Sequence, residues 1–141
     1  MSDGTSWRDE RREALAAQAA ALERQRAAEI ARARRLLTDF ATAMTERGLA
    51  PHALRARSAG GATYRTGLIG WYIRRNHALA VGMDGEFYVL DVPARLGGRL
   101  RGVTVEPSDP PLQVGRGARD GESMPLDELL RQRLDAGSDF P

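Results

Sequence analysis

The first third of the chain has the hydrophobic pattern of one long α-helix. Residues 7–47 contain no proline, no glycine and no cluster of turn residues, and they are rich in alanine, leucine and arginine. Because glycine and proline are the residues that most often end helices, this run predicts one continuous helix. We expect it to begin at Ser6 as the N-cap and to end at Gly48 as the C′ residue.

Apolar positions divide this helix into two halves. The second half has apolar residues every three or four positions, which predicts packing on a sheet: Ile30, Ala33, Leu37, Phe40, Ala41 and Met44. The first half has few large apolar residues besides Trp7, Leu15 and Leu22. At about 1.5 Å per residue the helix reaches roughly 60 Å, beyond a body with a radius of gyration near 13 Å. We therefore predict that residues 1–29 form a projecting helical arm.

Alternating apolar and polar residues predict a strand over residues 63–75. We expect Ile69, Trp71 and Ile73 on the inner face, under the helix. The outer face should then show a semi-apolar surface that is free to dock a partner, formed by Leu68, Tyr72 and Tyr88.

Two turn signals extend this strand into a three-stranded meander. Asn76-His77 is typical of a turn, and Asp84-Gly85 between two apolar runs is a strong hairpin signal, because both turn residues favour positive φ. The predicted second and third strands span residues 78–83 and 86–92.

The last third of the chain predicts shorter elements. Residues 100–106 are expected to form a fourth strand and residues 112–114 an edge strand. Ser123 is the expected N-cap of a helix over residues 124–136, and residues 138–141 should fray. The chain is therefore predicted to be an α+β protein. Its compact domain, residues 30–137, would hold an antiparallel sheet of four or five strands, one face covered by the second half of the long helix, with a short C-terminal helix.

The composition of the chain makes some classes of partner less favourable than others. The 21 basic residues are all arginine, but 19 acidic residues leave a net charge of only +2, which gives a weak net field for phosphate. Without cysteine there can be no disulfide or thiolate metal site. No apolar run approaches the roughly 18 residues that span a bilayer. We expect a cytoplasmic protein that does not enter membranes.

The loop Gly115 to Glu122 is the first candidate site. Its glycines let backbone amides approach a ligand, and Arg116 and Arg119 could hold an anion next to a helix N-terminus. The loop lacks the Gly-Lys-Ser/Thr ending of a phosphate-binding P-loop, and its two acidic residues oppose an anion. A structural turn is the simpler interpretation.

The second candidate site combines arginine with aromatic residues. Arg74 and Arg75 follow the predicted first strand, and Arg65 lies on the same strand, close to Tyr64 and Tyr72. Arginines beside aromatic rings on an open sheet can stack nucleic-acid bases. These residues are therefore possible anion or nucleic-acid contacts.

Signatures of catalysis are scarce. His52 and His77 are the only histidines, and no metal-ligand spacing connects them to carboxylates. Ser123 is not in a Gly-x-Ser-x-Gly elbow. We predict no catalytic, cofactor-binding or metal site and therefore no enzyme.

For function, we predict a non-catalytic interaction or adaptor protein. It would bind a protein partner, or a second copy of itself, through the projecting helix with Trp7, Leu15 and Leu22 as anchors, and through the exposed sheet face. The alternative is a nucleic-acid-associated module that uses the arginine-rich helix and sheet face. A third interpretation is a small enzyme with its site at the loop Gly115 to Glu122.

Overall fold

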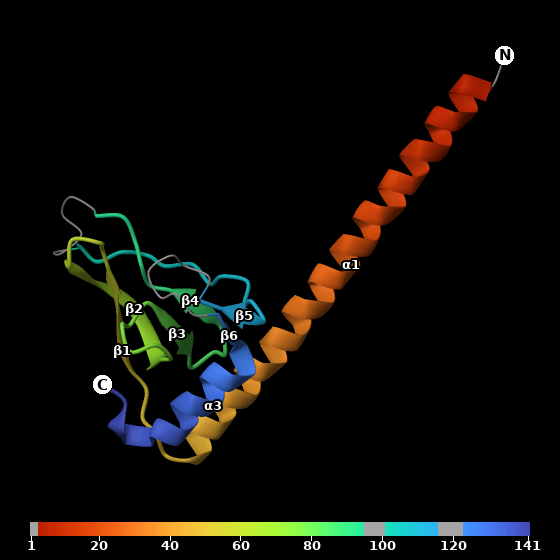
Figure 1. Cartoon of the computed structure of the whole chain (residues 1–141). Coiled ribbons are helices and arrows are strands. Elements are labelled where there is room, and N and C mark those ends of the chain that lie inside the picture. Colours follow the sequence, from red (N-terminus) through yellow and green to blue (C-terminus); the bar gives the residue numbers. More distant parts are fainter. Residues whose placement is uncertain (1–2, 95–100, 116–122) are drawn as a thin grey trace.

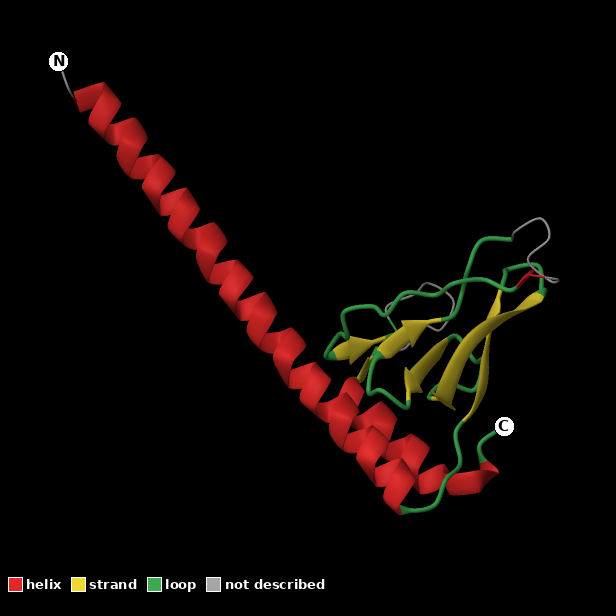
Figure 2. Cartoon of the chain, turned by 180° about the vertical axis from the view of Figure 1, so that it is seen from behind, coloured by secondary structure: helices red, strands yellow, loops and turns green. Residues whose placement is uncertain are grey.

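The computed structural model describes residues 3–94, 101–115 and 123–141, which form the predicted α+β fold. The body consists of a four-stranded antiparallel sheet, a second sheet of two short strands and a C-terminal helix, and the long N-terminal helix projects from it (Figure 1). Seen from behind, the two helices lie along one side of the strands, and most of the long helix extends past them (Figure 2).

Helix α1 spans Asp3–Glu46. Ser6 therefore lies inside the helix, and its predicted role as N-cap is wrong. Gly4 precedes it but lies within the helix, and no proline stands before it, so the first turn forms earlier. The predicted end is confirmed: Gly48 has φ 72°, and the N–H of Leu49 donates to the carbonyl of Met44 at 3.0 Å, as in a glycine-terminated helix.

The main sheet has the strand order β1-β2-β3-β4. These strands span His52–Arg57, Thr63–Tyr72, Leu79–Gly82 and Phe87–Val89. The predicted meander is confirmed. Of the two residues expected to have positive φ, Gly85 has φ 79°, whereas Asp84 does not adopt it; in the other turn His77 has φ 61°. The N–H of Gly85 donates to the carbonyl of Gly82 at 2.9 Å.

Strand β1 was not predicted. Its burial alternates, but only Leu54 and Ala56 are inside, between histidine and arginine residues. One leucine and one alanine give too weak an alternation of apolar and polar residues to distinguish a strand from a loop. Pairing with β2 provides the rest of the stabilisation.

A bulge interrupts the pairing of β1 with β2. Ala53 lies opposite Ile69 while Arg55 lies opposite Arg65, so β2 contains extra residues between these pairs. Gly67 adopts φ 76° there, and the hydroxyl of Thr66 donates to the carbonyl of Leu54 at 2.6 Å. Such a bulge bends the strand and re-aims the side chains that follow it.

Both faces of the sheet are covered, although unevenly. Trp71, Ile73 and Val81 join the core formed with α1 and the C-terminal helix. On the other face, Tyr88 packs with Leu54 and Leu90 and is only 4% exposed. The predicted outer face is therefore wrong for Tyr88.

That second face is covered by a segment without regular strand structure. The predicted strand over residues 100–106 is absent in its described part, residues 101–106. Instead the N–H of Val103 donates to the carbonyl of Arg65 and the N–H of Ser108 to the carbonyl of Phe87, both at 2.8 Å. Isolated bonds of this kind hold the segment on the sheet without a continuous ladder.

Ile69 is also placed differently from the prediction, because it is 52% exposed. It lies beside the β3–β4 turn, where the N–H of Met83 donates to its carbonyl at 3.0 Å. The helices cover the sheet around Trp71 and Ile73 and leave this end of the face open.

The C-terminal elements begin with a small hairpin. Strand β5, Gln113–Val114, pairs with β6, Met124–Pro125, in a separate sheet. Helix α3 then spans Leu126–Ala136 and ends at Gly137 as predicted. Pro125 precedes it, and the hydroxyl of Ser123 donates to the side-chain Oε1 of Gln113 at 3.2 Å. The predicted Ser123 cap is therefore wrong, because the strand pairing moves the helix start forward.

The last residues contact the body. A 3-10 turn, Gly137–Asp139, continues from α3, and the ring of Phe140 lies 4.3 Å from the guanidinium carbon of Arg133. The carbonyl of Pro141 is 2.8 Å from Nε2 of His77. Residues 138–141, which are predicted to fray, thus include an aromatic ring beside a buried cation, a contact that is attractive.

Candidate functional site

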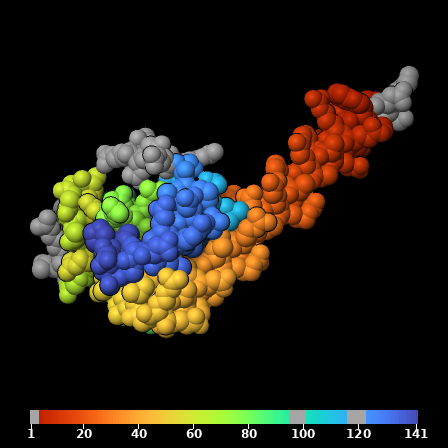
Figure 3. Space-filling view, turned by 60° about the horizontal axis from the view of Figure 1, so that its bottom comes forward, coloured from red at the N-terminus to blue at the C-terminus, as the bar shows by residue number. Residues whose placement is uncertain are grey.

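The N-terminal part of α1 is a surface without any cover. Every residue from 4 to 29 is exposed, and the space-filling view shows this part of the helix leaving the body as a single rod (Figure 3). Trp7, Leu15 and Leu22, the predicted anchors, are 59%, 61% and 62% exposed. We call residues 4–29 the arm.

The two leucines lie on the same side of α1 as the core residues further along it. Eighteen residues make about five helical turns, and this spacing separates Leu15 from Ala33 and Leu22 from Phe40. Ala33 and Phe40 are 0% and 2% exposed. The apolar stripe that binds α1 to the body therefore continues into the arm, where nothing in the described structure packs on it.

The arm is electrically balanced. Residues 4–29 contain five arginines and five acidic residues, so their net charge is zero. Near its start, the guanidinium carbon of Arg11 lies 5.0 Å from the centre of the Trp7 ring. Long-range attraction of phosphate to this part of the chain is therefore weak.

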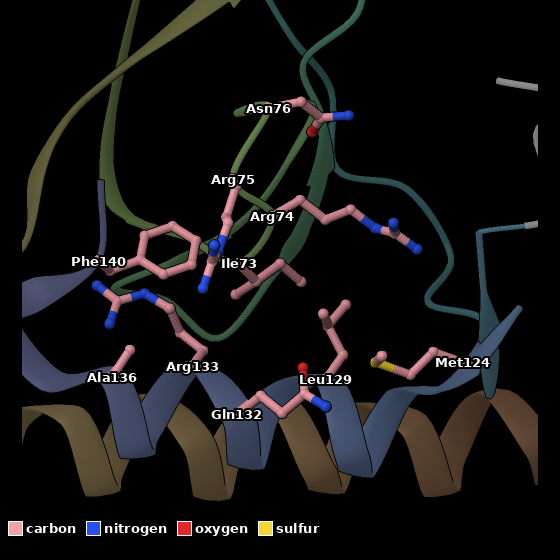
Figure 4. A pocket seen from close by; sticks show the side chains of 10 residues that line it. All are labelled: Ile73, Arg74, Arg75, Asn76, Met124, Leu129, Gln132, Arg133, Ala136 and Phe140. Atoms are coloured by element: carbon pink, nitrogen blue, oxygen red, sulfur yellow. The ribbon is translucent and has the colours of Figure 1, made fainter. Parts of the chain in front are cut away.

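A pocket between the end of β2 and α3 is the second candidate. Its volume is about 360 Å³, and its ten lining residues include three arginines and no acidic residue. The side chain of Arg75 extends from the strand end toward α3, while Arg74 extends along the pocket in the other direction (Figure 4). The walls between them are mainly apolar: Ile73, Met124, Leu129, Ala136 and Phe140.

Arg133 is the buried cation of this pocket. The residue is 6% exposed, its Nε donates to the carbonyl of Tyr72 and its Nη1 to the carbonyl of Gly137, both at 2.8 Å. Burial lowers its pKa. Within the described part of the chain no carboxylate pairs with it, which is unusual for a buried charge.

Sequence reasoning missed Arg133, although a signal was present. Leu126, Leu129 and Leu130 are the buried residues of α3, and Arg133 follows them on the same helical face. A charged residue on an otherwise apolar face is a polar group that the fold must satisfy.

The predicted group of Arg65, Arg74 and Arg75 is not one site. Arg65 lines a different cavity of about 670 Å³, together with Arg55 and Arg101. The remaining predicted contacts, Arg116 and Arg119, and the rest of the loop up to Glu122 lie outside the described residues.

The two tyrosines of the predicted stacking platform have other partners. Tyr64 is 2% exposed. Tyr72 stacks on the imidazole of His77 with 3.9 Å between ring centres, and its hydroxyl accepts a hydrogen bond from the N–H of Arg55 at 2.8 Å. One ring is therefore buried and the other is already stacked.

The described residues contain neither a metal-binding cluster nor a membrane-spanning helix. Histidine, aspartate and glutamate side chains do not gather in groups of three that could hold a metal ion. None of the described helices is long and apolar enough to cross a membrane.

Comparisons with known proteins add no assignment. No protein-family model, no curated protein and no solved structure matches this chain.

Proposed function

We propose that this chain is a non-catalytic interaction protein, and that its arm binds a helix of a protein partner. The observation that carries the proposal is the continuation of the apolar stripe into a fully exposed helix, with Leu15 and Leu22 more than half exposed. An amphipathic helix that lays such a stripe against an apolar surface is a common mode of protein recognition.

The energies involved suit a moderate, specific interaction. Burying a leucine side chain contributes about 1.5–3 kcal/mol, so the two leucines and the tryptophan together supply about 5–9 kcal/mol before the cost of association. Micromolar binding needs about 8 kcal/mol net, so the apolar surface of the partner has to contribute the rest. Alanines between them, such as Ala19, let a partner helix approach closely. The neutral charge of the arm favours a protein over a nucleic acid as its partner.

The test compares two double variants of the full chain. L15A/L22A removes the anchors, and E13A/R24A removes two exposed side chains from the opposite side of the same helix. We expect L15A/L22A to lose partner binding, self-association included, while E13A/R24A binds like the original chain. Binding is measured by light scattering for a second copy and by capture on the immobilised chain for a different protein. A partner that binds the original chain and binds L15A/L22A equally well would refute the proposal.

A second candidate function rests on the pocket beside α3. The lining of this pocket includes Arg75 and Arg133, no acidic residue and mainly apolar walls. It favours an organic anion with an apolar body, because the anion would neutralise the two arginines and the apolar part would fill the cavity. A carboxylate on an aromatic or branched group has this chemistry.

This candidate can be tested by NMR titration with N-acetylphenylalanine and, as a comparison, its uncharged amide. We expect saturable shifts at Ile73, Leu129 and Gln132 with the acid alone. Removing a charge-assisted hydrogen bond in R75Q should weaken binding by roughly tenfold. The matched control is R131Q, which changes an exposed arginine of α3 outside the pocket. Equal affinity of R75Q and the original chain would exclude this site.

A further inference from the structure

Four residues form a straight line along the arm. Arg8, Leu15, Leu22 and Glu29 are each seven residues apart, and seven residues make nearly two helical turns, so all four lie on one side of α1. All four are exposed. The line is basic at one end, apolar in the middle and acidic at the other end.

We infer that the arm pairs with the arm of a second copy in antiparallel orientation, an inference that rests on the proposed function. When two such lines run in opposite directions, Arg8 lies level with Glu29 of the second copy, and Leu15 lies level with Leu22. Each of the four residues of the line then meets its complement. In a parallel pair, Arg8 would meet Arg8 and Glu29 would meet Glu29, which is unfavourable at both ends.

The length of the exposed helix fits this arrangement. The overlap from residue 8 to residue 29 covers 22 residues, or about 33 Å, and cover by the body begins directly after it, with Ile30 partly buried and Ala33 at 0% exposure. In the antiparallel pair Trp7 comes level with Ile30 of the second copy. The exposed line is therefore used in full, and residues 4–6 of each arm come level with residues 31–33 of the second copy, beside its body.

The residues beside the line are compatible with close contact. Gln18 and Ala19 lie at the centre of the overlap, where small and uncharged side chains let the two backbones approach. Arg11 and Arg26 lie on the same face as the line, and in the antiparallel pair Arg11 comes level with Arg26 of the second copy. A parallel pair would also place these arginines level with arginines, so they lower the affinity in both orientations and do not reverse the preferred one. Their long side chains can extend the charges into solvent.

Orientation can be measured with spin labels, because the native chain has no cysteine. Ser6 and Ala20 both lie on the side of α1 away from the line. In an antiparallel pair the two Ala20 positions are about 4.5 Å apart along the axis and the two Ser6 positions about 37 Å. We expect S6C labels to report a clearly longer distance than A20C labels in electron spin resonance. Equally short distances would show a parallel pair and overturn the inference.

Charge reversal provides an independent measurement. R8E places two glutamates level at each end of an antiparallel pair, and we expect it to raise the dimer dissociation constant roughly fivefold. R8E/E29R should restore the affinity. R24E, on the opposite side of the helix, is the matched control and should leave affinity unchanged. If R8E also leaves it unchanged, the antiparallel contact is absent.

The solution mass separates this inference from the proposed function. We expect a species near twice 15.4 kDa at high protein concentration, lost in L15A/L22A. A monomer at every concentration overturns pairing with a second copy. If the arm of that monomer still binds a different protein through Leu15 and Leu22, the proposed function stands without this inference.

Discussion

Helix α1 contains two regions with the same backbone and opposite surroundings. In the half that lies on the body, Leu37 and Met44 are 1% and 0% exposed, whereas in the arm Leu15 and Leu22 are 61% and 62% exposed. Both regions are helical throughout. Helix formation in this chain therefore does not depend on burial, while attachment to the body does.

The difference comes from side-chain size more than from helix propensity. Alanine and arginine are strong helix formers, so the arm can hold its shape in water. Only the docked half carries enough large apolar residues, such as Phe40 against Trp71 with ring centres 6.2 Å apart, to bury a continuous surface. The arm is left as a preformed helix that a partner can bind without a large ordering cost.

The largest expected effect is from truncating a core leucine. Leu37→Ala removes a buried side chain from the core and should lower the free energy of unfolding by about 3 kcal/mol, measured by urea titration of Trp71 fluorescence. Leu22→Ala makes the same chemical change in the arm. At low protein concentration, where the chain is monomeric, we expect it to change that free energy by less than about 0.5 kcal/mol. Equal losses would mean that the arm packs on the body.

Raising the pH to alkaline values should destabilise the body but not the arm, because the body contains the buried hydroxyl of Tyr88. Burial, together with the hydrogen bond from the Tyr88 hydroxyl to Oδ2 of Asp84 at 2.9 Å, raises the pKa of Tyr88 from 10.0 to about 12. The protonated form is favoured in the folded state. The stabilising contribution is therefore complete below pH 10 and is lost as pH rises from 10 to 12.

This loss should be on the order of 2 kcal/mol, seen as a fall in the free energy of unfolding over that range. Tyr88→Phe has no proton to lose, so its fall should be smaller. Helical circular dichroism of the arm should remain, because residues 4–29 contain no tyrosine. Identical pH profiles for the two proteins would contradict this assignment.

The same substitution at the two ends of α1 should have unequal effects. Gly48 has φ 72°, which an alanine adopts only with strain, so Gly48→Ala should destabilise the body by about 1 kcal/mol. Gly4 is helical and has open space around its Cα, so Gly4→Ala should leave the unfolding transition unchanged. Thermal unfolding of the two variants side by side makes this comparison.

The smallest expected effect on the body is from loosening the arm. Ala19→Gly costs about 1 kcal/mol of local helix propensity and should speed amide hydrogen exchange around residue 19, with no measurable change in the unfolding of the body. Ala33→Gly, in the docked half, adds a lost core contact and should lower the stability of the whole domain. If both variants shift the unfolding transition of the body equally, the arm and the docked half of α1 are not independent.

Local signals in the sequence were sufficient for the helix end and for the two turns of the meander. Gly48 and Gly85 both adopt positive φ, and this freedom is a property of glycine itself. Strand β1 could not be predicted in the same way. Its two buried residues, Leu54 and Ala56, become part of a strand only because β2 pairs with them.

Positions that depend on cover by another element were predicted least well. Ile69 is exposed and Tyr88 is buried, although strand alternation alone places each on a definite face. Which part of a face is covered depends on where α1 and the segment around Val103 lie. The same holds for the pocket, where Arg133 meets Arg75 only after α3 packs beside the end of β2.

Propensity and periodicity act over a few neighbouring residues, so the sequence was enough to predict one long helix, an apolar side on its second half and an α+β fold. It did not reveal which elements cover that side. In the structure α3 and the strands around Trp71 pack on Ala33, Leu37 and Phe40, and these contacts join residues far apart in the chain. Long-range packing therefore decided what anchors the second half of α1.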